Sequence, residues 1–157
     1  MQTFQALAPI VAWLLVIGGW ILVRHDNNAR ENRHELRSKI DDMIKDIQEL
    51  EISTHEYYMA NADDKTPLAQ VAIKRKQTSL EKRVNRLKTS SVGFQDLKTI
   101  SDYRNELTGG DFEQLDRRAK DSSNKKMMEI SLAASALIDY LESEYERLYI
   151  KKPVKKP

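Results

Sequence analysis

The N-terminal stretch of the chain, residues 2–23, contains no Asp, Glu, Lys, Arg or His, and this feature constrains the fold more than any other. As an α-helix it would be roughly 33 Å long, which is enough to cross a hydrocarbon core of about 30 Å. A cleaved signal peptide would have basic residues before the apolar run and small residues after it. Here nothing basic precedes the run, and bulky residues end it in "GGWILVRH". We therefore expect a retained transmembrane anchor over residues 1–23, with a cleaved signal peptide and a buried soluble helix as the alternatives.

Basic residues flank this stretch on one side only. None precedes it, and those that follow within a short distance are Arg24, Arg30, Arg33, Arg37 and Lys39. Because cytoplasmic flanks of membrane spans carry an excess of Lys and Arg, we expect the N-terminus outside and the remainder in the cytoplasm. The predicted location is the inner (cytoplasmic) membrane, crossed once. A single span anchors or packs against other spans, and the residues expected at such contacts are Gly18, Gly19, Trp13 and Trp20.

The rest of the chain has the composition of a helical protein. It is rich in Glu, Lys, Leu, Ala and Arg, and the whole chain has only five Gly and four Pro. Apolar residues recur in steps of three and four, and no segment alternates as a strand does. We expect an all-α fold, with the transmembrane helix followed by a cytoplasmic bundle of four or five helices. The expected soluble helices are residues 24–60, 67–88, 94–107, a helix starting at residue 112 and interrupted at "DSSN", and residues 124–150.

The predicted domain organisation follows from these boundaries. Residues 1–23 are the anchor, residues 24–150 the cytoplasmic helical domain, and residues 151–157, "KKPVKKP", a basic and flexible tail. Gly109 and Gly110 suit a left-handed helix end, and Asp111 with Gln114 resembles a capping box that would start the next helix.

The residue patterns of common enzymes are missing from the sequence. His25, His34 and His55 are not at metal-ligand spacing, and there is no HExxH, P-loop or GxSxG pattern. No Cys is present, so thiolate metal sites and disulfides are excluded. We expect no catalytic residues, no metal and no cofactor, and we predict that the chain is not an enzyme.

Charge is distributed unequally between two consecutive predicted helices. Residues 40–64 contain eight acidic residues and one Lys, whereas residues 67–89 contain seven basic residues and one Glu. Two helices joined by a short loop run antiparallel, so the acidic helix should face the basic one. The simplest interpretation is mutual pairing of the two flanks, each exposed pair contributing about 0–1 kcal/mol.

A second interpretation is a binding surface for phosphates. Arg75, Ser79, Lys82 and Arg86 are spaced by four, three and four residues, so they lie along one side of a helix. Arg offers forked donors to phosphate and Lys a point charge, and Asn85 is placed to reach a base or sugar. Repeated around the axis of a homo-oligomer, such a row could hold a symmetric anionic ligand. Secondary candidates are the basic residues Arg117, Arg118 and Lys120 and the stacking residues Tyr57, Tyr58 and Tyr103, the tyrosines having a buried core role as their alternative.

A short apolar span, "APIVAWLLVIGGWILV", followed by a helical domain with a basic helix, "KRKQTSLEKRVNRLK", resembles the small membrane-anchored effectors of type III CRISPR systems. The resemblance implies a cytoplasmic domain that binds cyclic oligoadenylate and then acts on the membrane through a homo-oligomer, in antiviral defence. It implies the lipid bilayer, further copies of the chain and a cyclic oligonucleotide as partners. We expect no double-stranded nucleic acid as a partner. Because no βα pattern typical of cyclic-nucleotide-binding domains is present, recognition would use a helical surface.

Two other functions fit the same sequence features. One is a membrane-anchored helical scaffold that recruits a protein partner. The other is a phage lysis protein of the spanin-like type, which also has one span followed by helices. That second alternative would place the soluble part outside the cytoplasm, against the distribution of Lys and Arg.

Overall fold

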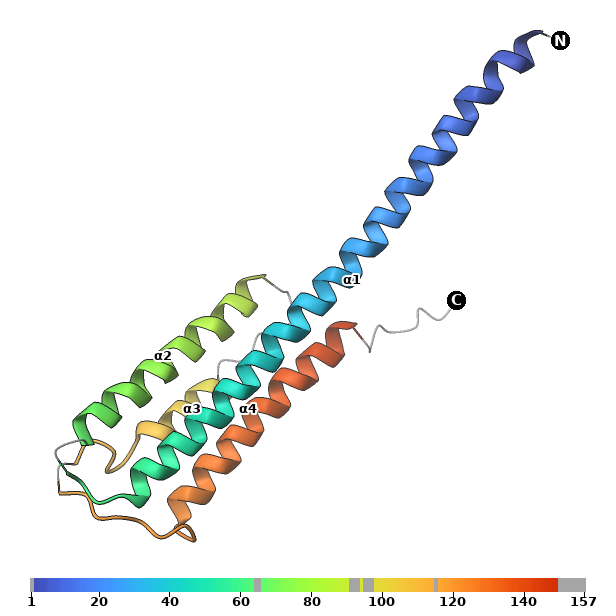
Figure 1. Cartoon of the computed structure of the whole chain (residues 1–157). Helices are drawn as coiled ribbons and strands as arrows, with labels where there is room; N and C mark the ends of the chain where they lie inside the picture. Colours follow the sequence, from blue (N-terminus) through green and yellow to red (C-terminus); the bar gives the residue numbers. More distant parts are fainter. Residues whose placement is uncertain (1, 64–65, 91–93, 95–97, 115, 150–157) are drawn as a thin grey trace. The chain divides into compact units, whose positions relative to one another are not determined.

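The chain folds into helices in every region of regular structure that the computed structural model describes, which confirms the all-α prediction (Figure 1). The described residues are 2–63, 66–90, 94, 98–114 and 116–149, without the side chains of residues 2–12, 14–15, 18, 21–22, 25–26, 29 and 89–90. The tail expected at residues 151–157 lies outside them. The helices are α1 (Gln2–Met59), α2 (Thr66–Ser90), α3 (Lys98–Thr108) and α4 (Lys125–Tyr149).

The chain divides into two units, Met1–Ser38 and Lys39–Pro157, and α1 contributes to both. The expected anchor helix and the first expected bundle helix are therefore one uninterrupted helix, and the described part holds four helices in all. In the N-terminal unit the guanidinium of Arg24 lies over the ring of Trp20, at 5.1 Å from its centroid. Trp13 and Trp20 are both exposed.

Within the part of the chain that the structure describes, none of the helices combines the length and the apolar character that a membrane span requires. The transmembrane helix expected over residues 1–23 therefore has no support from the structure. Of the residues expected at contacts between spans, Gly18 lies outside the described side chains. A Cβ atom added at Gly19 would meet no other described atom within 4 Å.

The core of the second unit is built from stripes of apolar residues at helical spacing. On α1 the stripe includes Ile40, Met43, Ile47 and Leu50, and on α4 it includes Ile130, Leu137 and Leu141, all essentially inaccessible to solvent. Full burial of one such side chain contributes about 1.5–3 kcal/mol. Helix α3 packs against both α4 and α2.

Polar contacts fix α2 and α4 on opposite flanks of the buried stripe of α1. On one flank, Asp46 pairs with Arg83 and Glu49 with Lys76, the latter at 3.6 Å. On the other flank, the hydroxyl of Ser131 in α4 donates a hydrogen bond to Glu51. In both cases higher residue numbers on α1 meet lower ones on the partner, so α2 and α4 both run antiparallel to α1. The acidic part of α1 thus faces the basic α2, as the charge pattern predicted.

The prediction of a helix starting at residue 112 is wrong. The described residues between Gly109 and Asn124 form turns and irregular segments, and Gly110, just after the end of α3, has a φ of 69°. Phe112 and Arg117 are both buried, but they are five residues apart, which does not place them on one helical face. Backbone hydrogen bonds hold the segment against the end of α1: the amide of Ala62 donates to the carbonyl of Arg117 and the amide of Lys120 to that of Tyr58. These tertiary contacts outweigh the local helix signals.

Candidate anion-binding surface

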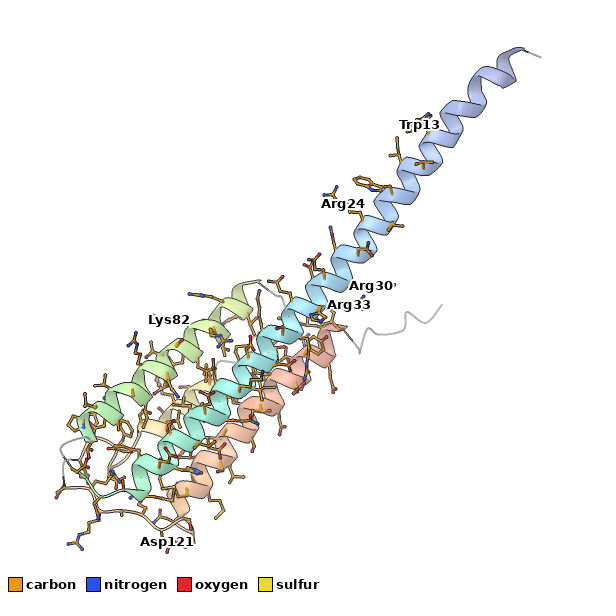
Figure 2. The ribbon with its side chains drawn as sticks, in the orientation of Figure 1. Trp13, Arg24, Arg30, Arg33, Lys82 and Asp121 are labelled. Atoms are coloured by element: carbon orange, nitrogen blue, oxygen red, sulfur yellow. The ribbon has the colours of Figure 1, made fainter. Side chains whose placement is uncertain are left out.

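Five of the seven cations of α2 fall into two groups according to their ion-pair partners. Three on its flanks are paired: Lys74 with Glu113, Lys76 with Glu49 and Arg83 with Asp46. Arg75 and Lys82, on the outward side, are exposed and have no ion-pair partner in the described part of the chain. Figure 2 shows Lys82 on the side of α2 that faces away from the other helices. The predicted row therefore exists as a solvent-exposed surface, which also includes Ser79, Arg86 and Asn85.

Arg86 also belongs to a pocket that the sequence did not indicate. The pocket has a volume of about 240 Å³ and lies between α1 and α2, lined by Lys39, Met43, Arg83, Arg86 and Leu87. It thus combines three cationic side chains with two apolar ones. The contribution of Lys39 was missed because the sequence pattern indicates this residue only as part of the basic flank after the apolar stretch.

This combination suits a ligand with a negative charge and a flat or apolar part. Two guanidinium groups and one ammonium offer forked and single donors to a phosphate. Met43 and Leu87 offer apolar contact area to a base or sugar. Arg83 keeps Asp46 as its partner, so the positive charge of the pocket is partly compensated before any ligand binds.

No protein-family model, no curated protein and no solved structure matches the chain.

Arg117, expected in a second exposed basic cluster, is instead buried, with 4 % of its surface accessible. Its Nη1 and Nη2 atoms donate hydrogen bonds of 3.0 and 2.6 Å to the carbonyls of Tyr58 and Tyr57, in the last turn of α1. Its guanidinium also lies 4.2 Å from the ring centroid of Tyr57. Carbonyls at a helix C-terminus lack intrahelical donors and carry partial negative charge, so this buried cation caps α1.

The three tyrosines proposed as stacking platforms are buried, which agrees with their alternative role in the core. The hydroxyl of Tyr57 donates to the carbonyl of Phe112, and that of Tyr103 donates to the carbonyl of Ile47 at 3.1 Å. Burial, with Asp111 as the next cause, raises the pKa of Tyr58. Burial also raises the pKa of Tyr103. These rings connect helices and loop, and Tyr57 also lines a pocket of about 390 Å³ together with Arg117.

The other two basic candidates differ from each other. Arg118 is exposed and has no hydrogen-bond or ion-pair partner among the described residues. Lys120 is partly buried, and its Nζ atom lies 2.6 Å from Oδ2 of Asp111. Arg117, Arg118 and Lys120 therefore do not form one surface. Among the residues that the structure describes, no group of His, Asp or Glu could hold a metal ion.

The Asp111–Lys120 pair gives a testable pH dependence. Burial alone would raise the pKa of Asp111, but the hydrogen bond and charge of Lys120 outweigh burial and hold the pKa below its ordinary value. Because the folded-state pKa is lowered, the stabilisation is present above about pH 4 and is lost as the pH falls through the folded-state value. We expect Lys120→Gln to raise the pKa of Asp111, as measured by carboxyl NMR titration. Lys125→Gln, which removes the partner of Glu129 on an exposed helix surface, is the control and should leave the titration of Asp111 unchanged; an unchanged Asp111 in Lys120→Gln would contradict the prediction.

Proposed function

We propose that the chain is a single-pass membrane effector whose helical domain binds an anionic nucleotide and acts on the bilayer in antiviral defence. The observation that carries the proposal is the pocket lined by Lys39, Arg83 and Arg86. The resemblance to type III CRISPR effectors adds cyclic oligoadenylate as the ligand and a homo-oligomer as the active form.

The size of the pocket limits what one chain can bind. Pockets for drug-sized ligands have volumes of about 300–1,000 Å³, and this one has about 240 Å³. It is therefore suited to one nucleotide unit rather than to a whole cyclic oligonucleotide. A ring-shaped ligand would place its other units in the pockets of further copies, which ties ligand binding to a symmetric assembly.

The membrane anchor in this proposal rests on the sequence of residues 2–23, which contains no charged residue. Five large apolar side chains there are each at least half exposed: Trp13, Val16, Ile17, Trp20 and Val23. The stack of Arg24 on Trp20 combines an aromatic ring and a cation, a pairing suited to the boundary between lipid and water.

A direct binding measurement tests the proposal. We expect the full-length chain in detergent to bind fluorescently labelled cyclic oligoadenylates, and Arg86→Glu to weaken the affinity at least about tenfold. The physical reason is the loss of charge-assisted hydrogen bonds to phosphate, worth about 1.5–3 kcal/mol, and the repulsion that replaces them. Arg118→Glu is the matched control, since it makes the same charge change at an exposed, unpaired position outside the pocket.

Two results would overturn the proposal. One is the absence of binding to cyclic oligoadenylates of every ring size at saturating concentration, which would favour a scaffold function. The other comes from a reporter enzyme fused to the C-terminus of the full-length chain. Reporter activity on the outer side of the inner membrane would exclude a cytoplasmic sensor and favour a lysis protein.

A further inference from the structure

Two helices of the second unit present outward faces with the same organisation. The α2 face consists of Leu68, Val71, Arg75, Ser79 and Lys82. The α4 face consists of Met128, Leu132, Ser135, Asp139 and Glu146. All ten residues are exposed, and steps of three, four or seven residues place each set along one side of its helix.

The N-terminal half of each face is apolar. Leu68 and Val71 on α2 are 73 % and 64 % exposed, and Met128 and Leu132 on α4 are 59 % and 63 % exposed. Removal of such large apolar side chains from water by a partner lowers the free energy. Paired exposed apolar residues at helical spacing are typical of a surface that a partner covers.

The C-terminal halves of the two faces carry opposite charge. Arg75 and Lys82 are the cations of the α2 face, and Asp139 and Glu146 are the acids of the α4 face. None of the four has an ion-pair partner within the described residues of its own chain. The two faces thus carry charges of opposite sign, and each face runs from apolar residues at its N-terminal end to charged residues at its C-terminal end.

The two faces also run in the same direction at nearly the same level. The contacts of Asp46 with Arg83 and of Glu51 with Ser131 show that α2 and α4 both start near the C-terminal end of α1. Counted from these contacts, Ser79 and Ser135 lie within about one helical turn of each other along the axis of α1, and so do Lys82 and Asp139. Because α2 and α4 lie on opposite flanks of α1 (Figure 1), the two faces of one chain cannot meet each other.

We infer that the α4 face of one copy docks on the α2 face of a second copy. With both copies in the same orientation and Lys82 beside Asp139, Val71 lies level with Met128, because each of these apolar residues precedes its charged residue by eleven positions. Leu132 then lies level with Arg75, whose aliphatic stem can pack on it. The opposite charges fix the register, and the apolar contacts add to the affinity. Since the two faces are different, a bound pair of copies still has one unoccupied α2 face and one unoccupied α4 face. The contact therefore repeats into a row or closes into a ring, an arrangement that suits chains anchored in one bilayer.

Disulfide crosslinking tests this contact in membranes from cells that make the full-length chain. The chain has no Cys, so disulfides between copies can form only through introduced residues. We expect Ser79→Cys combined with Ser135→Cys to give a ladder of dimers, trimers and larger species under mild oxidation. Ser79→Cys alone should stay monomeric, as should Ser79→Cys combined with Asp102→Cys on the exposed side of α3. A missing ladder in the first variant, or dimers of Ser79→Cys alone, would overturn the inference.

A charge exchange in the same cysteine background tests the register. Lys82→Glu and Asp139→Lys should each reduce the crosslinked fraction about tenfold, because like charges then meet in the interface. The two changes together should restore the ladder. Failure of the combined variant to recover would show that the acids of α4 are not the partners of α2, and would leave an anionic lipid surface or another protein as the occupant.

The α2 face shares Arg75, Ser79 and Lys82 with the exposed basic row of α2, but the proposed function rests on the pocket of Lys39, Arg83 and Arg86, which none of these three residues lines. The two proposals can therefore fail separately. A ladder without cyclic oligoadenylate binding would support this contact and overturn the proposed function. Binding of cyclic oligoadenylate without a ladder would support the proposed function and overturn this contact.

Discussion

Replacement of Arg117 by Ala should lower the free energy of unfolding of the helical unit by about 3–4 kcal/mol. Arg117 donates two hydrogen bonds to the carbonyls of Tyr57 and Tyr58 and stacks on the ring of Tyr57. Hydrogen bonds from a charged donor contribute about 1.5–3 kcal/mol each, and a buried cation–π contact adds about 1–2 kcal/mol. Part of the cost of burying the guanidinium is recovered on its removal, so the net loss is smaller than the sum.

Arg117 joins two parts of the fold through both its side chain and its backbone. It forms no ion pair with a carboxylate in the described part of the chain, and its charge is balanced by the carbonyl end of α1. Its own carbonyl accepts a hydrogen bond from Ala62, just beyond that end. The side chain and backbone of one residue therefore join the 109–124 segment to the turn between α1 and α2.

Chemical denaturation of the full-length chain in detergent, followed by circular dichroism, measures this effect. Arg117→Lys should retain part of the stability, since Lys keeps the charge but not the fork that reaches two carbonyls. Arg118→Ala is the control, because Arg118 is exposed and the change should stay within about 0.5 kcal/mol. Equal losses in Arg117→Ala and Arg118→Ala would contradict the capping role.

The sequence predicted the helices because their apolar residues recur at helical spacing. Ile40, Ile47 and Leu50 on α1 and Ile130, Leu137 and Leu141 on α4 are all buried, as that spacing requires. The 109–124 segment was predicted wrongly, because Asp111 and Gln114 imitate a helix start locally. What holds this segment is contact with residues about 60 positions away, such as that of Arg117 with Tyr58, and a local pattern does not contain such information.

The candidate site was predicted only in part, because a local sequence pattern shows which side of a helix is exposed but not which residues of another helix lie beside it. Arg75 and Lys82 are exposed on α2 because they lie opposite the buried Val84 and Leu87, a relation that helical periodicity gives directly. The pocket depends instead on Lys39 and Met43 of α1 meeting α2 across the hairpin. The side-by-side register of two helices is set by packing and ion pairs such as Asp46–Arg83, so it could not be read from either helix alone.

Replacement of Phe112 by Ala should cost about 3–5 kcal/mol, which is typical of a buried Phe-to-Ala change. Phe112 is fully buried, and its ring centroid lies 4.8 Å from that of Tyr57 and 6.2 Å from that of Tyr58. Its carbonyl accepts hydrogen bonds from Tyr57 and from Gln70, the latter at 2.9 Å. Loss of the ring leaves a cavity beside two aromatic side chains and weakens the position of the carbonyl that links α1 with α2.

Two further variants show whether the loss of unfolding free energy in Phe112→Ala comes from the buried ring. Phe112→Leu keeps most of the apolar volume and should cost less than about 1.5 kcal/mol. Leu132→Ala removes apolar atoms from a side chain that is 63 % exposed, so it should change stability by less than about 0.5 kcal/mol. The same Leu132→Ala change should weaken the crosslinked ladder, because this side chain belongs to the proposed contact between copies. A Phe112→Ala chain whose free energy of unfolding stays within about 1 kcal/mol of the original would show that the 109–124 segment is not held by this ring, and Arg117 would then be its main anchor.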